Sequence, residues 1–318
     1  MLKSVVKKLL DVIFDKSLPS PTSAELAYLS ELKTVFLELS ISETTNLLPV
    51  EASWLSNANR LRELVLNHDP REFLRWDIIS NTMFVSYAQY ISMELNYLKH
   101  RSDWNTRWRT AIKESWVGHP MPYIFYRASS GNLIHHAYHV AHFEEKTNIL
   151  IQNMDYVFEF GGGYGSMCRL LYNLGFHGRY VLFDLPSFSA LQRYYLRTLG
   201  LPVQAVTDFV KSNNGIVCVS DLQQLITLLT HGTEAKSKMF IATWSISESP
   251  LSIRETVLNL TSDFHSFLIA YQDRSGDVNN LDFFNHWKET KRKIIWHSWQ
   301  IEHIPGNYYL VGTVASDL

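Results

Sequence analysis

The chain has only two cysteines, and this small number excludes some classes of protein. Its 318 residues include only Cys168 and Cys218, which lie far apart and outside any CxxC motif. Two such cysteines exclude a disulfide framework and a zinc knuckle, and they fit a reducing compartment. We therefore expect a cytoplasmic protein.

An excess of charge and a long apolar run are also missing. The 29 lysines and arginines nearly balance the 31 aspartates and glutamates, so nucleic acid is not an expected partner. No apolar run approaches the ~20 residues that a membrane-spanning helix needs. Residues 1–16 have amphipathic helical spacing, which favours packing on the protein body over weak contact with a membrane surface. A small-molecule or glycan substrate is the expected partner, and a homo-oligomer is compatible with the sequence.

The two halves of the chain differ in the spacing of their apolar residues. Residues 1–150 have mostly helical apolar spacing, and Thr22 or Ser23 can cap the first helix after the break at 18–23. The run 82–100 has helical spacing without a breaker, which predicts a continuous helix. We expect this half to be an α-helical region that serves as a lid, contacts substrate or forms an oligomer.

From residue 151 to 318, short β-rich runs alternate with helical patterns. This alternation is typical of βαβ units and predicts an α/β fold with a parallel, doubly wound, Rossmann-like sheet. Residues 292–304 and 307–314 are two strand-like runs with no helix between them. They predict an antiparallel hairpin at the C-terminal edge of that sheet.

The stretch FEFGGGYGS, residues 158–166, places a glycine-rich turn between a strand-like run and a helix that starts at Ser166. Such a turn lets main-chain N–H groups approach a ligand closely. Gly161 and Gly163 fit the dinucleotide motif G-x-G-x-x-G, but Ser166 occupies its last position. Glu159 precedes the glycines, and a carboxylate there repels pyrophosphate and suits a cation.

Acidic residues follow the next two predicted strands. Asp184 ends the second strand, where a carboxylate can accept hydrogen bonds from both hydroxyls of a ribose. Asp221 ends the third strand and would face an adenine amino group, with Leu222 against the ring. Asp208 is the rival for that position, and Asp221 is preferred because a helix begins directly behind it.

With these motifs, residues 151–318 resemble the class I S-adenosylmethionine-dependent methyltransferases, and most closely the sugar O-methyltransferases among them. The resemblance is carried by FEFGGGYGS, LFDLPSFSALQRYYL, IATWSISESP, SGNLIHHAYH and EHIPGNYYL. It implies S-adenosylmethionine as the cofactor. The implied cofactor contacts are Glu159, Gly161, Gly163, Tyr164, Asp184, Leu185, Asp221 and Leu222. Thr243, Trp244 and Ser245 should lie near the transferable methyl group, with Ser245 toward the substrate; Gly162 is an extra glycine relative to the family pattern.

Three charged or titratable side chains are candidates for roles in methyl transfer. Glu248 follows the fourth strand and is the first candidate for the base that a sugar hydroxyl requires; its alternative role is a helix-end acid. His303, at the hairpin turn, is the second candidate for the base, and its alternative is a surface histidine. Arg127 could pair with the carboxylate of the cofactor, although a surface arginine is the more common case.

A histidine-rich helix is predicted around residues 131–147. His135, His139 and His142 share one stripe and could in principle ligate zinc, but no cysteine or carboxylate cluster completes such a site, so we predict no metal. A lid helix over the cofactor is favoured, in which Asn132, His135 or His136 touches the substrate. Buried structural histidines are the second interpretation.

The sequence therefore predicts an S-adenosylmethionine-dependent O-methyltransferase for a free, nucleotide-linked or lipid-linked sugar. The alternatives are an O- or N-methyltransferase of another metabolite, a dinucleotide-dependent oxidoreductase, and a binding module that retains the cofactor pocket. Glu159 and the terminal hairpin count against the oxidoreductase, and Glu248 counts against the binding module.

Overall fold

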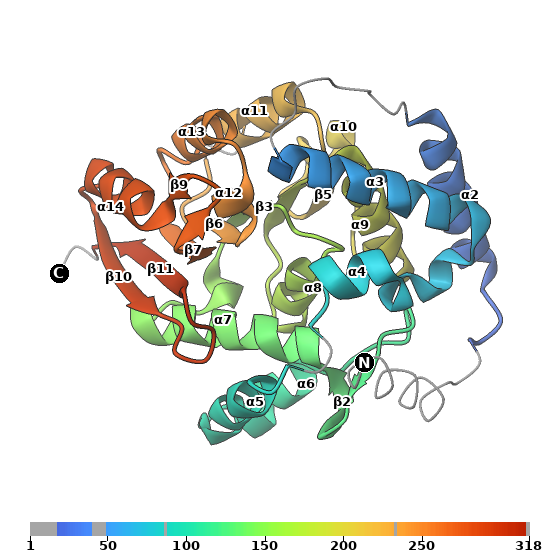
Figure 1. Cartoon of the computed structure of the whole chain (residues 1–318), viewed down its shortest axis with the longest axis horizontal. Helices are drawn as coiled ribbons and strands as arrows, with labels where there is room; N and C mark the ends of the chain where they lie inside the picture. Colours follow the sequence, from blue (N-terminus) through green and yellow to red (C-terminus); the bar gives the residue numbers. More distant parts are fainter. Residues whose placement is uncertain (1–17, 40–48, 86–87, 232–233, 316–318) are drawn as a thin grey trace.

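The computed structural model of the chain describes residues 18–39, 49–85, 88–231 and 234–315 (Figure 1). The interpretation of residues 1–16 as an amphipathic helix lies outside these ranges. Among the described residues, no helix combines the length and the apolar character needed to cross a membrane.

A seven-stranded mixed sheet organises the C-terminal half. Its spatial order is β10-β11-β7-β6-β3-β4-β5, in which the first five strands in chain order run parallel and the last two are antiparallel. The strands are β3 (Tyr156–Phe160), β4 (Arg179–Phe183), β5 (Gly215–Val219), β6 (Lys238–Thr243), β7 (Ser266–Gln272), β10 (Ile294–Gln300) and β11 (Asn307–Val314). The predicted α/β fold and its terminal hairpin are confirmed. β11 enters between β7 and β10, so β10 forms the edge.

Helices cover both faces of this sheet, because successive strand residues point to opposite faces and both faces are apolar. Val157 and Leu182 belong to the core that α8 and α9 cover, whereas Phe158 and Val181 belong to the core that α11 and α13 cover. The helices of this half are α8 (Ser166–Asn173), α9 (Pro186–Thr198), α10 (Val206–Phe209), α11 (Leu222–His231), α12 (Ser245–Glu248), α13 (Leu251–Leu260) and α14 (Asn280–Thr290). A small hairpin, β8 (Arg274–Ser275) and β9 (Val278–Asn279), precedes α14.

The N-terminal half is mainly helical, as predicted. Thr22 caps its first described helix by accepting a hydrogen bond from the backbone N–H of Glu25 at 3.1 Å. Its elements are α2 (Ser23–Glu38), α3 (Pro49–Asn67), η1 (Pro70–Arg75), α4 (Asp77–Thr82), α5 (Ile91–His100), η2 (Trp104–Trp108), α6 (Arg109–Ala111), the hairpin β1 (Pro122–Tyr123) and β2 (Tyr126–Ser130), α7 (Gly131–Thr147) and η3 (Ile151–Asn153). These helices share one continuous core with α8 and α9. The division at residue 150 therefore stays a prediction.

The predicted continuous helix across residues 82–100 is wrong. α4 ends at Thr82 and α5 begins at Ile91, and the described residues between them, 83–85 and 88–90, are not helical. Phe84 turns into the core, and the backbone N–H of Val85 donates to Oδ1 of Asn132 at 3.2 Å. A tertiary hydrogen bond and aromatic burial thus replace the helical pattern that the local sequence favours. This break matters because Met83, Phe84, Val85 and Tyr90 line a cavity at the ends of the strands.

Candidate active site

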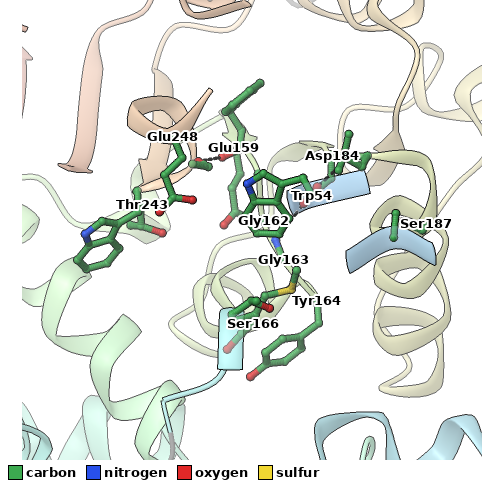
Figure 2. A pocket seen from close by; sticks show the side chains of 18 of the residues that line it. Trp54, Glu159, Gly162, Gly163, Tyr164, Ser166, Asp184, Ser187, Thr243 and Glu248 are labelled. Carbon is green, nitrogen blue, oxygen red and sulfur yellow. Dashed lines mark hydrogen bonds between the residues drawn. The ribbon is translucent and has the colours of Figure 1, made fainter. Parts of the chain in front are cut away.

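A cavity of about 890 Å³ opens at the carboxyl ends of β3, β4 and β6. β3 and β6 are neighbours although two strands separate them in the chain, so this is the point where the strand order reverses. Ligands of open α/β sheets bind at such a point. The volume lies toward the upper end of the roughly 300–1,000 Å³ typical of small-molecule sites. Figure 2 shows Glu248 and Thr243 on one side of the cavity and Asp184 and Trp54 on the other.

The glycine loop after β3 needs its glycines for conformation and for close packing. Gly161 and Gly163 have φ angles of +69° and +58°, which side-chain-bearing residues rarely adopt. A Cβ atom added to Gly161 would lie 2.2 Å from Cβ of Ser245. The loop therefore lies directly against the start of α12, which brings the ends of β3 and β6 together.

The same loop does not offer all of its N–H groups to a ligand. The N–H of Gly161 donates to the carbonyl of Phe183 at 2.8 Å, and that of Gly163 donates to Oδ2 of Asp184 at 3.0 Å. These are the two glycines that fit the dinucleotide motif. The expectation that their N–H groups face a ligand is therefore corrected, and a pyrophosphate lacks these donors.

Asp184 is held in place at the cavity by three donors. Its carboxylate accepts from the N–H groups of Gly163 at 3.0 Å and Leu185 at 2.8 Å, and from Nε2 of Gln192 at 3.0 Å. Burial raises its pKa to about 7, although these hydrogen bonds pull the pKa downward. The side chain is thus oriented before any ligand arrives, and it ionises near neutral pH.

Glu159 lies deeper in the same cavity, near the end of β3. The side chain is buried, and its Oε2 accepts a hydrogen bond from the hydroxyl of Tyr180 at 2.7 Å. Burial raises the pKa of Glu159 to about 8; the Tyr180 hydrogen bond lowers it and the neighbouring Asp184 raises it. A cation in the cavity would favour the ionised form of both acids.

Carboxyl groups dominate the charge of the cavity. Within the lining that the described residues form, Glu159, Asp184 and Glu248 face a single guanidinium, that of Arg62. Arg62 is already engaged, because it donates to the carbonyl oxygens of Phe36 at 2.7 Å and Leu37 at 3.4 Å. A cationic ligand would favour the ionised form of these carboxyl groups, whereas the described lining offers little positive charge to a pyrophosphate.

The segment after β6 forms the opposite wall. Trp244 has a left-handed backbone with φ +64°, and its Nε1–H donates to Oδ1 of Asn307 at 2.6 Å. The hydroxyl of Ser245 donates to the carbonyl of Phe160. Glu248 lines the cavity, burial raises its pKa, and no hydrogen-bond donor reaches its side chain among the described residues. Its carboxyl group is thus free to meet a ligand.

Sequence analysis missed Glu94, a fully buried carboxylate on α5. Its Oε1 lies 2.8 Å from Nδ1 of His135 and 2.8 Å from Nε2 of His303. Burial alone would raise the pKa of Glu94, but the charges and hydrogen bonds of the two histidines outweigh burial and hold the pKa below its usual range. No sequence motif surrounds Glu94, because its partners are 41 and 209 residues away.

Most of the predicted site residues line this one cavity. They are Glu159, Gly161, Gly163, Tyr164, Asp184, Leu185, Thr243, Trp244, Ser245, Glu248, Asn132, His135 and His136. The amide of Asn132 is committed to the protein itself, since its nitrogen donates to the Tyr164 hydroxyl at 2.9 Å and its oxygen accepts from Val85. The N-terminal half was expected to contact substrate, but its residues were not named; the wall that it contributes includes Trp54, Met83, Phe84 and Tyr90.

Four predicted residues lie outside the described lining of the cavity. Asp221 is exposed and accepts from the N–H of Gln224 at 2.8 Å, which caps α11, and Leu222 begins that helix. Arg127 is exposed on β2. His303 is directed at Glu94 rather than at the cavity. The rival acid, Asp208, is likewise exposed, on α10, and does not line the cavity.

The remaining histidines of α7 are packed in the interior. Burial lowers the pKa of His136 to about 3 and that of His142 to about 4. His139 is fully buried, and its Nδ1 is hydrogen-bonded to the Tyr309 hydroxyl. Within the described ranges, no three His, Cys, Asp or Glu side chains are arranged to hold a metal ion. The geometry of His139 and His142 fits the interpretation of structural histidines.

No family model and no curated protein matches the chain. Among solved structures, the chain is similar to the methyltransferase domain of bacterial CtHen1, at 12% identity and a TM-score of 0.39 over 58% of this chain and 99% of that one. It is also similar to an SAH-bound methyltransferase of Podospora anserina, at 9% identity and a TM-score of 0.38 over 86% of this chain and 100% of that one. A third likeness is to a precorrin-6y C5,15-methyltransferase of Geobacter metallireducens, at 12% identity and a TM-score of 0.34 over 59% of this chain and 89% of that one. At these values the likenesses establish neither an activity nor a substrate, and the fold assignment depends on the strand order of the sheet.

Proposed function

We propose that the protein is an S-adenosylmethionine-dependent O-methyltransferase that acts on a sugar hydroxyl. The observation that carries the proposal is the acid-lined cavity at the point where the strand order of the sheet reverses, with Asp184 oriented in it by three donors. A dinucleotide-dependent oxidoreductase is disfavoured, because the described lining offers a pyrophosphate little positive charge and the N–H groups of Gly161 and Gly163 are already used.

The residues present fit the cofactor. Asp184 would accept hydrogen bonds from the two ribose hydroxyls, and Glu159 and Glu248 would offset the positive charge. Thr243 and Trp244 would border the methyl group at the end of β6. When bound, S-adenosylmethionine supplies a methyl group on a sulfonium, which is an electrophile without any metal.

The wall from the N-terminal half supports a sugar as the acceptor. Trp54 and Tyr90 present aromatic side chains to the cavity, and Asn59 and Asn81 add amide groups that can donate and accept hydrogen bonds. Aromatic faces with nearby amides suit the apolar faces and hydroxyl edges of a sugar ring. Another hydroxyl- or amine-bearing metabolite is the alternative acceptor.

Calorimetric titration with S-adenosylmethionine, S-adenosylhomocysteine and NADH tests the cofactor. We expect binding of the first two and not of NADH. Transfer of labelled methyl from S-adenosylmethionine to free monosaccharides, nucleotide-linked sugars and lipid-linked sugars then tests the acceptor. Binding of NADH alone would contradict the proposal. Methyl transfer only to metabolites other than sugars would support a methyltransferase and contradict a sugar as its acceptor.

A further inference from the structure

We propose that His135 is the base that takes the proton of the acceptor hydroxyl, and that Glu94 is its positioning residue. This inference rests on the proposed methyltransferase function and assigns its proton-transfer step. Sequence analysis placed the base at Glu248 or His303. The contacts of the buried carboxylate on α5 point instead to the histidine on α7.

Glu94 determines which nitrogen of His135 can accept a proton. An ionised carboxylate only accepts hydrogen bonds, so Nδ1 of His135, at 2.8 Å from Oε1 and 3.0 Å from Oε2, must carry the hydrogen. In the neutral imidazole, Nε2 is then the acceptor. Nε2 has no hydrogen-bond partner among the described residues, and His135 lines the cavity.

The ring of His135 is fixed between aromatic neighbours. It stacks on Trp244, with ring centroids 5.7 Å apart and planes 22° apart, and Tyr90 lies 5.5 Å away on a tilted plane. Trp244 directly follows β6, so the imidazole lies at the strand end where the transferable methyl group is expected. A base held in one orientation is effective because the reacting atoms need no further ordering.

The same carboxylate links three separate elements. Glu94 comes from α5, His135 from α7 and His303 from the turn between β10 and β11. Tyr90 also packs on His303, with centroids 5.2 Å apart. His303 therefore contributes to catalysis by holding Glu94, and its ring nitrogen Nε2 is not aimed at an acceptor.

The proton transfer balances without a further reactant. As the acceptor oxygen bonds the methyl carbon, the carbon–sulfur bond breaks and its electron pair stays on sulfur. His135 takes the hydroxyl proton on Nε2, and the resulting imidazolium is stabilised by Glu94 until the proton passes to solvent. The titratable groups around the ring are Glu94, which is hydrogen-bonded to it, Tyr90 and His139, whose rings contact it, and the neighbouring His136; His303 shares Glu94 with it.

Glu248 is less suited to this step. Its carboxyl group lines the cavity, yet no hydrogen bond from the described residues fixes its direction. A free carboxyl group beside a cationic ligand acts as a charge partner, and this role needs no defined orientation. The two residues can therefore be separated by experiment, since a charge partner affects cofactor affinity and a base affects turnover.

The first measurement needs no acceptor. ¹⁵N NMR of histidine-labelled protein bound to S-adenosylhomocysteine reports the tautomer of each imidazole, and the His135 signal is assigned by its loss in His135→Gln. In the neutral form of the His135 imidazole we expect the hydrogen on Nδ1, with Nε2 unprotonated. Glu94→Gln should remove this preference. An Nε2–H tautomer in the wild type would overturn the proposal.

The second measurement is methyl transfer to the best sugar of the acceptor panel. His135→Gln should lower kcat and kcat/KM together by about 10²–10⁴ while S-adenosylhomocysteine affinity stays unchanged. Glu94→Gln should lower kcat in the same way, to a smaller extent. The matched control is His142→Gln, on the same helix but outside the cavity lining, which should turn over normally.

The outcomes separate this inference from the function on which it rests. A wild-type protein that fails to bind S-adenosylmethionine, or to transfer methyl to any sugar, refutes the proposed function. A wild type that is active, together with His135→Gln at the wild-type rate, refutes the base assignment alone. If His303→Gln is inactive and His135→Gln is active, the histidine predicted from the sequence is the base.

Discussion

Cofactor binding should be coupled to the ionisation of Asp184. In the free protein, burial raises the pKa of Asp184 to about 7. In the complex, two ribose hydroxyls and the positive charge of the cofactor favour the carboxylate, so the pKa falls. The affinity for S-adenosylmethionine should therefore be full above pH 7 and should be lost as the pH falls through 7.

The size of this effect follows from the fraction of Asp184 that is already ionised. With a pKa of about 7, roughly nine-tenths of the carboxyl groups are ionised at pH 8, half at pH 7 and one-tenth at pH 6. The affinity should fall about tenfold between pH 8 and pH 6, which corresponds to about 1.4 kcal/mol. At pH 7, binding should release about half a proton from Asp184.

Isothermal titration calorimetry in two buffers with different protonation enthalpies measures both quantities. The amino group of the cofactor also ionises near pH 8, and so does Glu159. The variant Asp184→Asn is therefore the control, because it keeps the ionisation of the ligand and of Glu159 and removes that of Asp184. The difference between wild type and variant isolates Asp184. The coupling would be refuted if both showed the same pH dependence, or if the wild type took up protons on binding.

Two further substitutions test the loop and the acid after β6. Gly161→Ala should lower the free energy of unfolding by at least ~1 kcal/mol, measured in urea, because its Cβ would lie 2.2 Å from Cβ of Ser245 and its φ is +69°. The control is Gly200→Ala, which has a similar φ of +76° but no atom within 4 Å of the added Cβ, and it should lower the free energy of unfolding by less. Equal losses of stability in the two variants would mean that the left-handed backbone conformation, and not the contact with Ser245, determines the destabilisation. Glu248→Gln should weaken S-adenosylmethionine more than S-adenosylhomocysteine and lower kcat less than His135→Gln; a loss of about 10²–10⁴ in kcat at unchanged affinity would make Glu248 the base.

The predictable parts of the fold are those with local signals. The runs that became β3, β4, β5, β6 and β7 are apolar, short and followed by helical patterns, so their order along the chain was sufficient to indicate a parallel sheet. Glu159, Gly161 and Asp184 could be predicted for the same reason, since each is defined by its distance from the end of a strand.

The unpredictable parts depend on contacts between distant segments. Glu94 looks like an ordinary helical glutamate, and only folding brings it to His135 and His303. The break after Thr82 depends on Asn132, which accepts from Val85 across 47 residues. Asp221 was misassigned for a different reason. An acidic residue directly before a helix is a local signal both for a ligand contact and for a helix N-cap, and in the structure Asp221 is the N-cap.

The two halves of the cavity carry different tasks. Glu159, Asp184 and the glycines, which would hold the cofactor, lie at the end of β3 and on the loops after β3 and β4. Trp54, Asn59 and His135, which would meet the acceptor, lie on helices of the N-terminal half. A sheet of this kind can therefore keep its cofactor site while its acceptor changes, because substitutions in the helices leave the strand ends unaltered. The proposed methyl donor and the proposed acceptor are therefore tested by substitutions in different parts of the chain. The acceptor must be sought through the helical wall, where Glu94 connects the chemistry of His135 to the hairpin at the other end of the chain.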